Sequence, residues 1–392
     1  MTLVLNFQGA GAGNSSLQDK ATKTLLLRIF AGFWILGLLN NSAYVIMIAG
    51  ANEIAASAVG LVYLFAIGPT IIVKLSAPYW FHLVGYSTRF WVAAALMSCS
   101  FIIVGCSKSM TKQLLGVGLV AIQGGLGEAS ALGLCSLYPN QLSLTAWSSG
   151  TGFAGIAGYA WVAVLHYWLG LSYNATLLLA NVMPVAWLAV FHLGLQRLKP
   201  SQLSKAAVEY QPLPVTAAAE AQEAAADVAA PADAEYAMQS GTWTAIGFPV
   251  TSADARHHFY LYSNWMYQAG VCVSRSSGML YQANRMVLWL MPGLQCLLLA
   301  FFTIDAVTHT WYNWGLLSLC FLAGLLGGAV YVNSFTLLSK EVEPGLREFS
   351  LSAACVADSL GIACADVAAI AIQGCLFRWQ NLPGAAYSCG ST

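Results

Sequence analysis

Charged side chains are scarce in this chain of 392 residues. Only 8% of the residues are Asp, Glu, Lys or Arg, whereas soluble proteins carry about 25%. The 16 basic and 16 acidic residues cancel, so neither a disordered polyanion nor a basic nucleic-acid-binding protein fits the composition. There are too few charges to cover the surface of a soluble globule. Since 58% of the residues are apolar, the chain is predicted to be a polytopic membrane protein.

The signatures of common enzyme classes are missing as well. The six histidines are dispersed, and no H-E-x-x-H, G-x-S-x-G or P-loop pattern occurs. A single His-His pair at residues 257–258 is too little for a di-iron membrane oxidase. An intramembrane aspartyl pair needs two facing helices, but Asp358 and Asp366 fall in one predicted helix. We therefore expect no enzyme, no metal site and no cofactor.

The ten cysteines show no metal-binding or redox spacing. No C-x-x-C motif is present, and most of the cysteines fall inside long apolar runs. We interpret them as small apolar packing residues. They indicate little about the redox state of the compartment.

Long uncharged stretches, by contrast, are abundant and predict an all-α fold. A bilayer core about 30 Å thick takes about 20 residues of apolar helix. No charged residue lies between Glu128 and Arg197, and this stretch alone is long enough for at least two spans. The span predicted at 259–275 is aromatic and polar, so a re-entrant segment is the alternative there. About ten spans are predicted, at residues 25–49, 57–79, 89–107, 113–138, 148–168, 174–196, 259–275, 284–303, 311–338 and 349–377.

The order of these spans predicts two helical bundles that are separated by an acidic, Ala-rich linker. Such a layout is typical of secondary transporters, whose substrate sites lie between the two halves. Lys20, Lys23 and Arg28 lie at the start of the first span and predict a cytosolic N-terminus. The five predicted parts are an N-terminal tail (1–24), a six-helix bundle (25–197), a cytosolic linker (198–256), a second bundle (257–379) and a C-terminal tail (380–392).

Two short motifs concern trafficking and modification. The linker contains Tyr210-Gln-Pro-Leu213, which has the form of a sorting signal read by coat adaptors, although such tetrapeptides are common by chance. Asn174-Ala-Thr176 matches the glycosylation pattern and lies in the loop before the sixth span. With a cytosolic N-terminus, that loop is predicted to be luminal.

Glycines at helical spacing predict close contacts between helices. Small residues four apart, such as Gly324 and Gly328, let helices approach closely in lipid. The segment WSSGTGFAG, with Gly150, Gly152 and Gly155, contains so many helix-weakening residues that we also expect a bent or broken helix there.

Charges inside the predicted spans are candidates for function, because each costs roughly 2.5 kcal/mol or more at the bilayer centre. Glu128, Arg275, Asp358 and Asp366 are such residues. The alternative is an ion pair that only holds helices together, such as Glu128 with Arg275 or with Lys74.

Several longer motifs stand out in the predicted spans. They include FWILGLLNNSAYVIM (33–47), WSSGTGFAG (147–155), MYQAGVCVSRSS (266–277), GLLGGAVYVNSF (324–335) and CVADSLGI (355–362). In their number and order, these motifs resemble the battenin family of lysosomal membrane proteins.

The resemblance implies a fold similar to that of the major facilitator superfamily, located in the lysosomal or vacuolar membrane. It also implies a role in clearing glycerophosphodiesters, the deacylated remnants of phospholipids. The family is further linked to vacuolar pH and to basic amino-acid balance.

One region departs from the family pattern. The family has a full hydrophobic helix before MYQAG, whereas this chain has the Ala-rich segment followed by WTAIGFPV at 243–250. Eight apolar residues cannot cross a bilayer as a helix. We therefore expect either that one family helix is missing, which would invert the second bundle relative to the first, or that residues 257–282 are arranged unusually.

A glycerophosphodiester is a small anion with hydroxyl arms, and this chemistry suggests a role for each polar residue in the spans. Arg275 offers a forked donor to phosphate oxygens, and Lys74 is a second cation. Broken-helix amides at 148–152 would add dipolar attraction. Glu128 and Asp358 are candidates for proton coupling. The expected hydroxyl partners are Tyr267, Gln268, Tyr331 and Asn333.

Two other functions stay open at this stage. Glu128 and Asp358 would also suit the acid-lined cavity of a basic amino-acid carrier. A non-transporting adaptor that binds sorting factors through the linker is the alternative from a different class. The charges inside the spans favour transport.

Overall fold

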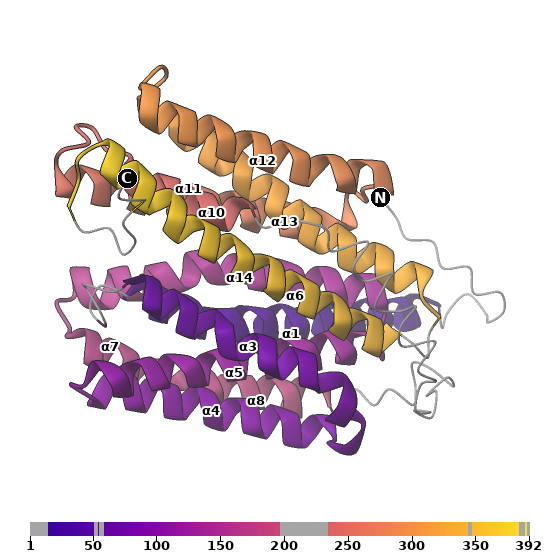
Figure 1. The fold of residues 1–392 in the computed structure, drawn as a ribbon. Helices are drawn as coiled ribbons and strands as arrows, with labels where there is room; N and C mark the ends of the chain where they lie inside the picture. Colours follow the sequence, from indigo (N-terminus) through magenta and orange to yellow (C-terminus); the bar gives the residue numbers. More distant parts are fainter. Residues whose placement is uncertain are drawn as a thin grey trace.

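The computed structural model describes residues 15–50, 54, 59–196, 234–343, 347–383 and 389. Regular structure within these ranges is entirely helical (Figure 1), which confirms the predicted all-α fold. The predicted sorting motif, Tyr210 to Leu213, lies outside the described residues.

The N-terminal half consists of five long helices and a sixth crossing built from three shorter pieces. The connections between successive helices are short, so that neighbours in sequence run antiparallel. The long helices are α1 (Ser15–Ala49), α3 (Val59–Trp80), α4 (Tyr86–Cys106), α5 (Met110–Cys135) and α6 (Asn140–Val162), which continues as the π-helix η2 (Ala163–Trp168). The sixth crossing comprises α7 (Tyr173–Leu179), α8 (Val182–Ala189) and the π-helix η3 (Val190–Leu195).

The described part of the C-terminal half contains four long helices and three short helical pieces. The long helices are α11 (Ala253–Ser276), α12 (Arg285–Thr308), α13 (Leu316–Glu341) and α14 (Arg347–Trp379). The short pieces are α10 (Ala234–Ser240), η5 (Thr242–Ala245) and η6 (Ser277–Met279). Since α11 has 24 residues in one continuous helix, the re-entrant alternative for 259–275 was wrong.

Seven helical stretches among the described residues are long and apolar enough to cross a membrane. The long helices α6 and α11 are not among them. These two more polar helices pack against each other at the contact between the two halves (Figure 1). Their polar residues are therefore sheltered by protein, which is where a membrane protein tolerates them.

The directions of the helices show that the second half is not inverted. The six antiparallel crossings of the first half bring the end of η3 back to the end of the molecule where α1 begins. The helix α11 runs antiparallel to α6, because Gly152 faces Arg275 whereas Gly155, further along α6, faces Gln268, earlier on α11. We call the end of the molecule where α1 begins the first end, and the other end the second end. Since α6 runs from the first end to the second, α11 starts at the second end.

Between η3 and α11 the chain therefore passes from the first end to the second. The segment α10–η5 is the described part of this passage and packs against α12 and α14. Met238 and Trp243 are fully buried there. The predicted cytosolic linker, 198–256, was thus wrong in its C-terminal part: residues from 234 onward belong to the C-terminal half. The expectation of an inverted second half was wrong for the same reason.

A disulfide links the last helix to the C-terminal tail. Cys375 of α14 is bonded to Cys389, with the two Cα atoms 4.9 Å apart. The interpretation of all ten cysteines as packing residues was wrong for this pair. Because α14 runs toward the second end, the disulfide lies there, at the same end as the start of α7.

Candidate functional site

A central cavity lies between the two halves of the protein. It has two adjoining parts, which share Asn41, Tyr44, Tyr236 and Arg275. The first part comprises about 680 Å³ of empty space, counting space open to solvent. Its lining comes from α1, α3 and α5 of one half and from α10, α11, α13 and α14 of the other.

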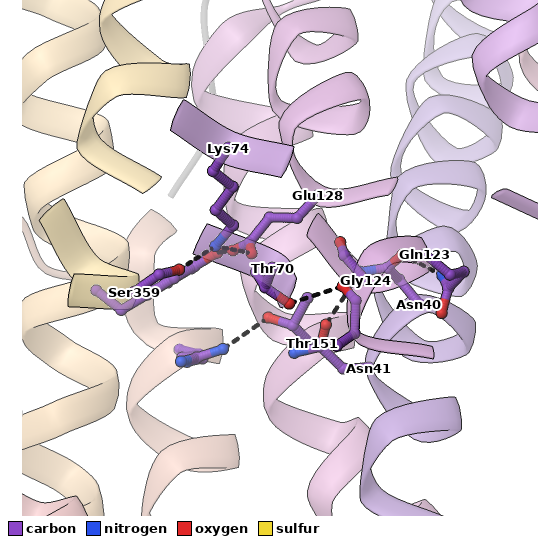
Figure 2. A network of polar contacts seen from close by, with 12 residues as sticks. Asn40, Asn41, Thr70, Lys74, Gln123, Gly124, Glu128, Thr151 and Ser359 are labelled. Carbon is purple, nitrogen blue, oxygen red and sulfur yellow. Dashed lines mark hydrogen bonds and ion pairs between the residues drawn. The ribbon is translucent and has the colours of Figure 1, made fainter. Parts of the chain in front are cut away.

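A buried ion pair closes one wall of the first part (Figure 2). The Lys74 Nζ lies 2.7 Å from Glu128 Oε2, and it donates a hydrogen bond of 2.7 Å to Ser359 Oγ. The Tyr331 hydroxyl donates to the other oxygen of Glu128, Oε1, at 2.6 Å. Lys74 is only 2% exposed. The cluster thus joins α3 and α5 of the first half to α13 and α14 of the second.

The geometry shows that Glu128 and Lys74 are paired with each other. Glu128 forms the ion pair with Lys74 that the sequence left open as an alternative to a functional charge. Lys74 is therefore engaged by protein groups and is not a second free cation for a substrate phosphate in this conformation. Both side chains still line the cavity.

Arg275 is the cation at the junction of the two parts of the cavity. Its Nη1 donates to Thr151 Oγ1 at 2.9 Å, and its guanidinium carbon lies 3.9 Å from the centre of the Tyr331 ring. The Nε atom is buried and has no hydrogen-bond partner among the described residues. The guanidinium is held by a stacking contact and one hydroxyl, so most of its donor groups can turn to an anion.

The remaining polar residues predicted for the site line the cavity, with the exception of Asn333. Asp358 lines the first part of the cavity, and Tyr267, Gln268 and Asp366 line the second. Asn333 is not brought to either part. Its Oδ1 accepts from the backbone N–H of Ala283 at 2.8 Å, and its Nδ2 donates to a carbonyl in its own helix. The prediction that Asn333 binds hydroxyls therefore fails in this structure, because its amide holds the loop before α12.

The predicted break at 148–152 is not present, since α6 is a continuous α-helix through this segment. Its backbone amides take part in the helix, and the departure from regular geometry comes later, in η2. The glycines instead provide room. A Cβ on Gly150 would overlap the carbonyl oxygen of Trp34, and a Cβ on Gly152 would lie 3.2 Å from atoms of Arg275. Gly155 leaves space for the Gln268 side chain in the same way.

The glycine pair of α13 lies at an equally close approach. A Cβ on Gly324 would overlap the carbonyl oxygen of Tyr267, and one on Gly328 would overlap the hydroxyl of Ser274. Both contacts are made by α11, so these two glycines let α11 and α13 pack backbone to backbone.

Three further residues that line the cavity had not been singled out. Asn41 and Tyr44 come from the FWILGLLNNSAYVIM motif, in which the Asn-Asn pair inside an apolar helix was an available signal. Tyr236 lines both parts of the cavity but falls in the segment predicted as linker. It directly follows Glu235, and nothing in the local pattern separates it from the acidic stretch before it.

Two other predictions concern the surface and metals. Asn174 is exposed near the start of α7, where a glycan could reach it, so its glycosylation stays a prediction. Within the described residues, no group of three or more His, Cys, Asp or Glu side chains could hold a metal ion.

Comparison with known sequences identifies the family. The family model described as "CLN3 protein" matches residues 31–234 and 232–379. The chain belongs to the CLN3 family. The second match begins at residue 232, so α10 falls within the part of this CLN3-family chain that follows the family pattern.

Relatives of this CLN3-family protein match it over nearly their full length. Battenin from Canis lupus familiaris is 31% identical over 413 residues, covering 90% of this chain and 92% of the relative. Protein btn-1 from Neurospora crassa is 30% identical over 446 residues, with 96% and 95% covered.

Solved structures with a similar fold are members of the major facilitator superfamily. The proton:xylose symporter XylE superposes with a TM-score of 0.65 at 12% identity, covering 94% of this chain and 93% of that one. The fucose:proton symporter FucP of E. coli gives a TM-score of 0.60 at 12% identity, with 92% and 94% covered. The fold of this CLN3-family protein is therefore that of the major facilitator superfamily, as predicted.

Proposed function

We propose that this protein is a secondary transporter of the lysosomal or vacuolar membrane that exports glycerophosphodiesters. The observation that carries the proposal is the position of Arg275, with unengaged donor groups, in a cavity lined by both halves. A guanidinium binds phosphate oxygens through paired hydrogen bonds. Tyr236, Asn41 and Gln268 supply neutral groups for the glycerol hydroxyls along the same cavity.

The fold supports movement of a substrate between the two halves. In such transporters one bundle rocks against the other around a central site. The contacts of Lys74 with Ser359 and of Glu128 with Tyr331 cross between the halves and would have to open and re-form in each cycle. Two solved structures with this fold, XylE and FucP, are sugar:proton symporters, so we propose that proton movement drives this protein as well.

A basic amino-acid carrier is the second candidate, because Asp358 and Asp366 line the two parts of the cavity. The contacts of the charged groups, rather than their sum, argue for an anion. Glu128 is neutralised by Lys74, whereas Arg275 has no carboxylate on its hydrogen-bonding groups among the described contacts.

Counterflow in reconstituted vesicles tests the proposal. Vesicles loaded with unlabelled glycerophosphoglycerol should take up the labelled compound, and the Arg275→Lys variant should do so roughly tenfold to a hundredfold more slowly. The reason is the loss of charge-assisted hydrogen bonds, each worth about 1.5–3 kcal/mol. Arg285→Lys is the matched control, since Arg285 pairs with Glu341 on the surface. Equal rates for Arg275→Lys and wild type, or uptake of lysine in place of the phosphodiester, would refute the proposal.

We also propose that the first end of the molecule faces the cytosol and the second end faces the lumen. The basic residues around the first span favour this orientation. Both Asn174 and the disulfide between Cys375 and Cys389 lie at the second end. Disulfides persist in oxidising compartments and are rare where the cytosol keeps thiols reduced.

The disulfide gives this orientation a direct test. After free thiols are blocked, reduction should expose the two thiols of the Cys375–Cys389 bond to a polyethylene glycol maleimide. A gel shift of two tags is expected for protein from its native membrane. Cys375→Ser should gain none, whereas Cys99→Ser, which removes an exposed free thiol, should gain two like the wild type. Wild-type protein that gains no tag would contradict a luminal second end.

A further inference from the structure

A buried carboxyl group on α10 is not accounted for by the substrate site. Glu235 is only 5% exposed and does not line either part of the cavity. Its Oε2 has no hydrogen-bond partner among the described residues. Its Oε1 lies 3.5 Å from the Tyr267 hydroxyl, at the outer limit of a hydrogen bond.

The surroundings of Glu235 are polar, but among the residues that the structure describes no cation is paired with it. From α12 comes Gln295, which is fully buried, and from α13 comes Gly327, where a Cβ would overlap Glu235 Oε1. The helix α14 contributes Asp358, whose charge acts on Glu235, and Asp366, which accepts a hydrogen bond from Ser240 on α10. The helix α11 contributes Tyr267 and Arg275.

Arg275 does not neutralise Glu235 in this conformation, since it donates to Thr151 and stacks on Tyr331. A carboxylate that is buried without a counter-ion is costly, and the neutral, protonated acid is the form that such a site stabilises. Asp358 adds a second negative charge nearby and acts in the same direction. The protonated form of Glu235 therefore needs no counter-ion here, whereas its ionised form depends on the positive charge of Arg275.

We propose that Glu235 is the proton-binding group that couples substrate movement to the proton gradient. The inference rests on the proposed transport function. Tyr267 connects the two sites, because it lines the cavity and its hydroxyl lies against Glu235. A phenol both donates and accepts hydrogen bonds, so it can pass a proton between cavity water and the carboxyl.

The charge balance explains how a proton and an anion move together. One proton binds to a carboxylate oxygen of Glu235 and makes it neutral, while Arg275 holds the substrate phosphate. When the phosphate leaves, the positive charge of Arg275 is no longer compensated and favours the ionised form of Glu235. The proton then returns through Tyr267 to water in the cavity. No other group is oxidised, reduced or transferred.

Glu128 is less suited to this role. Its two oxygens are engaged by Lys74 and by the Tyr331 hydroxyl, so its charge is already compensated. The binding of a proton there would leave Lys74 buried without its partner.

Two transport measurements separate coupling from substrate binding. In the Glu235→Gln variant, counterflow of glycerophosphoglycerol should continue near the wild-type rate, because exchange requires no net proton movement. Accumulation driven by an imposed pH gradient should be abolished. Glu341→Gln, which changes a surface carboxylate paired with Arg285, should retain both. Gradient-driven accumulation in Glu235→Gln would overturn the inference, whereas absence of counterflow in the wild type would refute the transport function itself.

A measurement without substrate keeps the inference testable in either case. Infrared difference spectra between acidic and alkaline buffer should contain the C=O band of a protonated carboxylic acid in the wild type. One component of this band should be absent in Glu235→Gln, while the components from the other carboxyl groups of the chain remain. If Glu235→Gln fails to fold, Glu235→Asp, which keeps a carboxyl group, should shift the pH at which this component appears. A component that Glu235→Asp leaves in place, or that is lost only in Asp366→Asn, would overturn the assignment.

Discussion

Replacement of Lys74 by Met is expected to destabilise the protein by about 3–5 kcal/mol, because it leaves the Glu128 carboxylate buried without its cation. Lys74 is 2% exposed and Glu128 is 15% exposed, so little water is available to replace the lost charge. The substitution also removes the hydrogen bond from Lys74 Nζ to Ser359. A large loss of thermal stability in detergent should follow, measured as the decrease in Tm.

The matched control and the double variant identify the cause. Arg285→Met breaks the pair of Arg285 with Glu341, whose side chains are 60% and 39% exposed, and such surface pairs contribute only about 0–1 kcal/mol. Lys74→Met combined with Glu128→Gln should regain most of the lost stability, because the uncompensated charge is then gone. If Lys74→Met were no less stable than Arg285→Met, the buried pair would not hold the halves together.

The charges that line the cavity were predictable because lipid penalises each of them individually. Lys74, Glu128 and Arg275 stand out in otherwise apolar sequence, and all three line the cavity. Their pairing was not predictable. Lys74 and Glu128 lie on different helices, and the choice between Lys74 and Arg275 as the partner of Glu128 depends on how α3, α5 and α11 meet.

The segment that contains α10 was not predicted as part of the second bundle, because a hydropathy pattern identifies only helices that are apolar enough to face lipid. A segment that is buried among other helices does not need to be apolar along its whole length, and α10 packs against α12 and α14. Glu235 and Tyr236 therefore resemble a hydrated linker in composition while one is buried and the other lines the cavity. The disulfide was missed for a related reason, since its partners lie in different predicted parts, the last span and the tail.

Glycines are ambiguous in a sequence because the same residue can either weaken a helix or allow two helices to pack closely. In water, Gly weakens a helix by about 1 kcal/mol relative to Ala, and this favoured a break around Gly150. In the structure, the contact between α1 and α6 decides the matter. The two helices approach so closely that Gly37 of α1 faces the carbonyl oxygen of Trp147, while Gly150 of α6 faces that of Trp34. Both helices remain continuous.

We expect Gly150→Ala to reduce the amount of folded protein sharply, because α1 and α6 pack closely at this position. A Cβ at this position would overlap the carbonyl oxygen of Trp34 and lie 3.0 Å from the backbone nitrogen of Leu38. Backbone atoms cannot rotate away as a side chain can, so α1 and α6 must separate. Overpacking of this kind costs about 1–3 kcal/mol or more. The loss should appear as aggregation in size-exclusion chromatography.

Gly68→Ala is the matched control, because nothing lies within 4 Å of a Cβ built there. It makes the same chemical change inside α3 and should be neutral or slightly stabilising, since Ala favours the helix by about 1 kcal/mol over Gly. If the two variants behaved alike, helix propensity alone would govern both positions. A defect confined to Gly150→Ala locates the cause in the contact between α1 and α6. That contact positions Thr151, and through it Arg275, at the junction of the cavity.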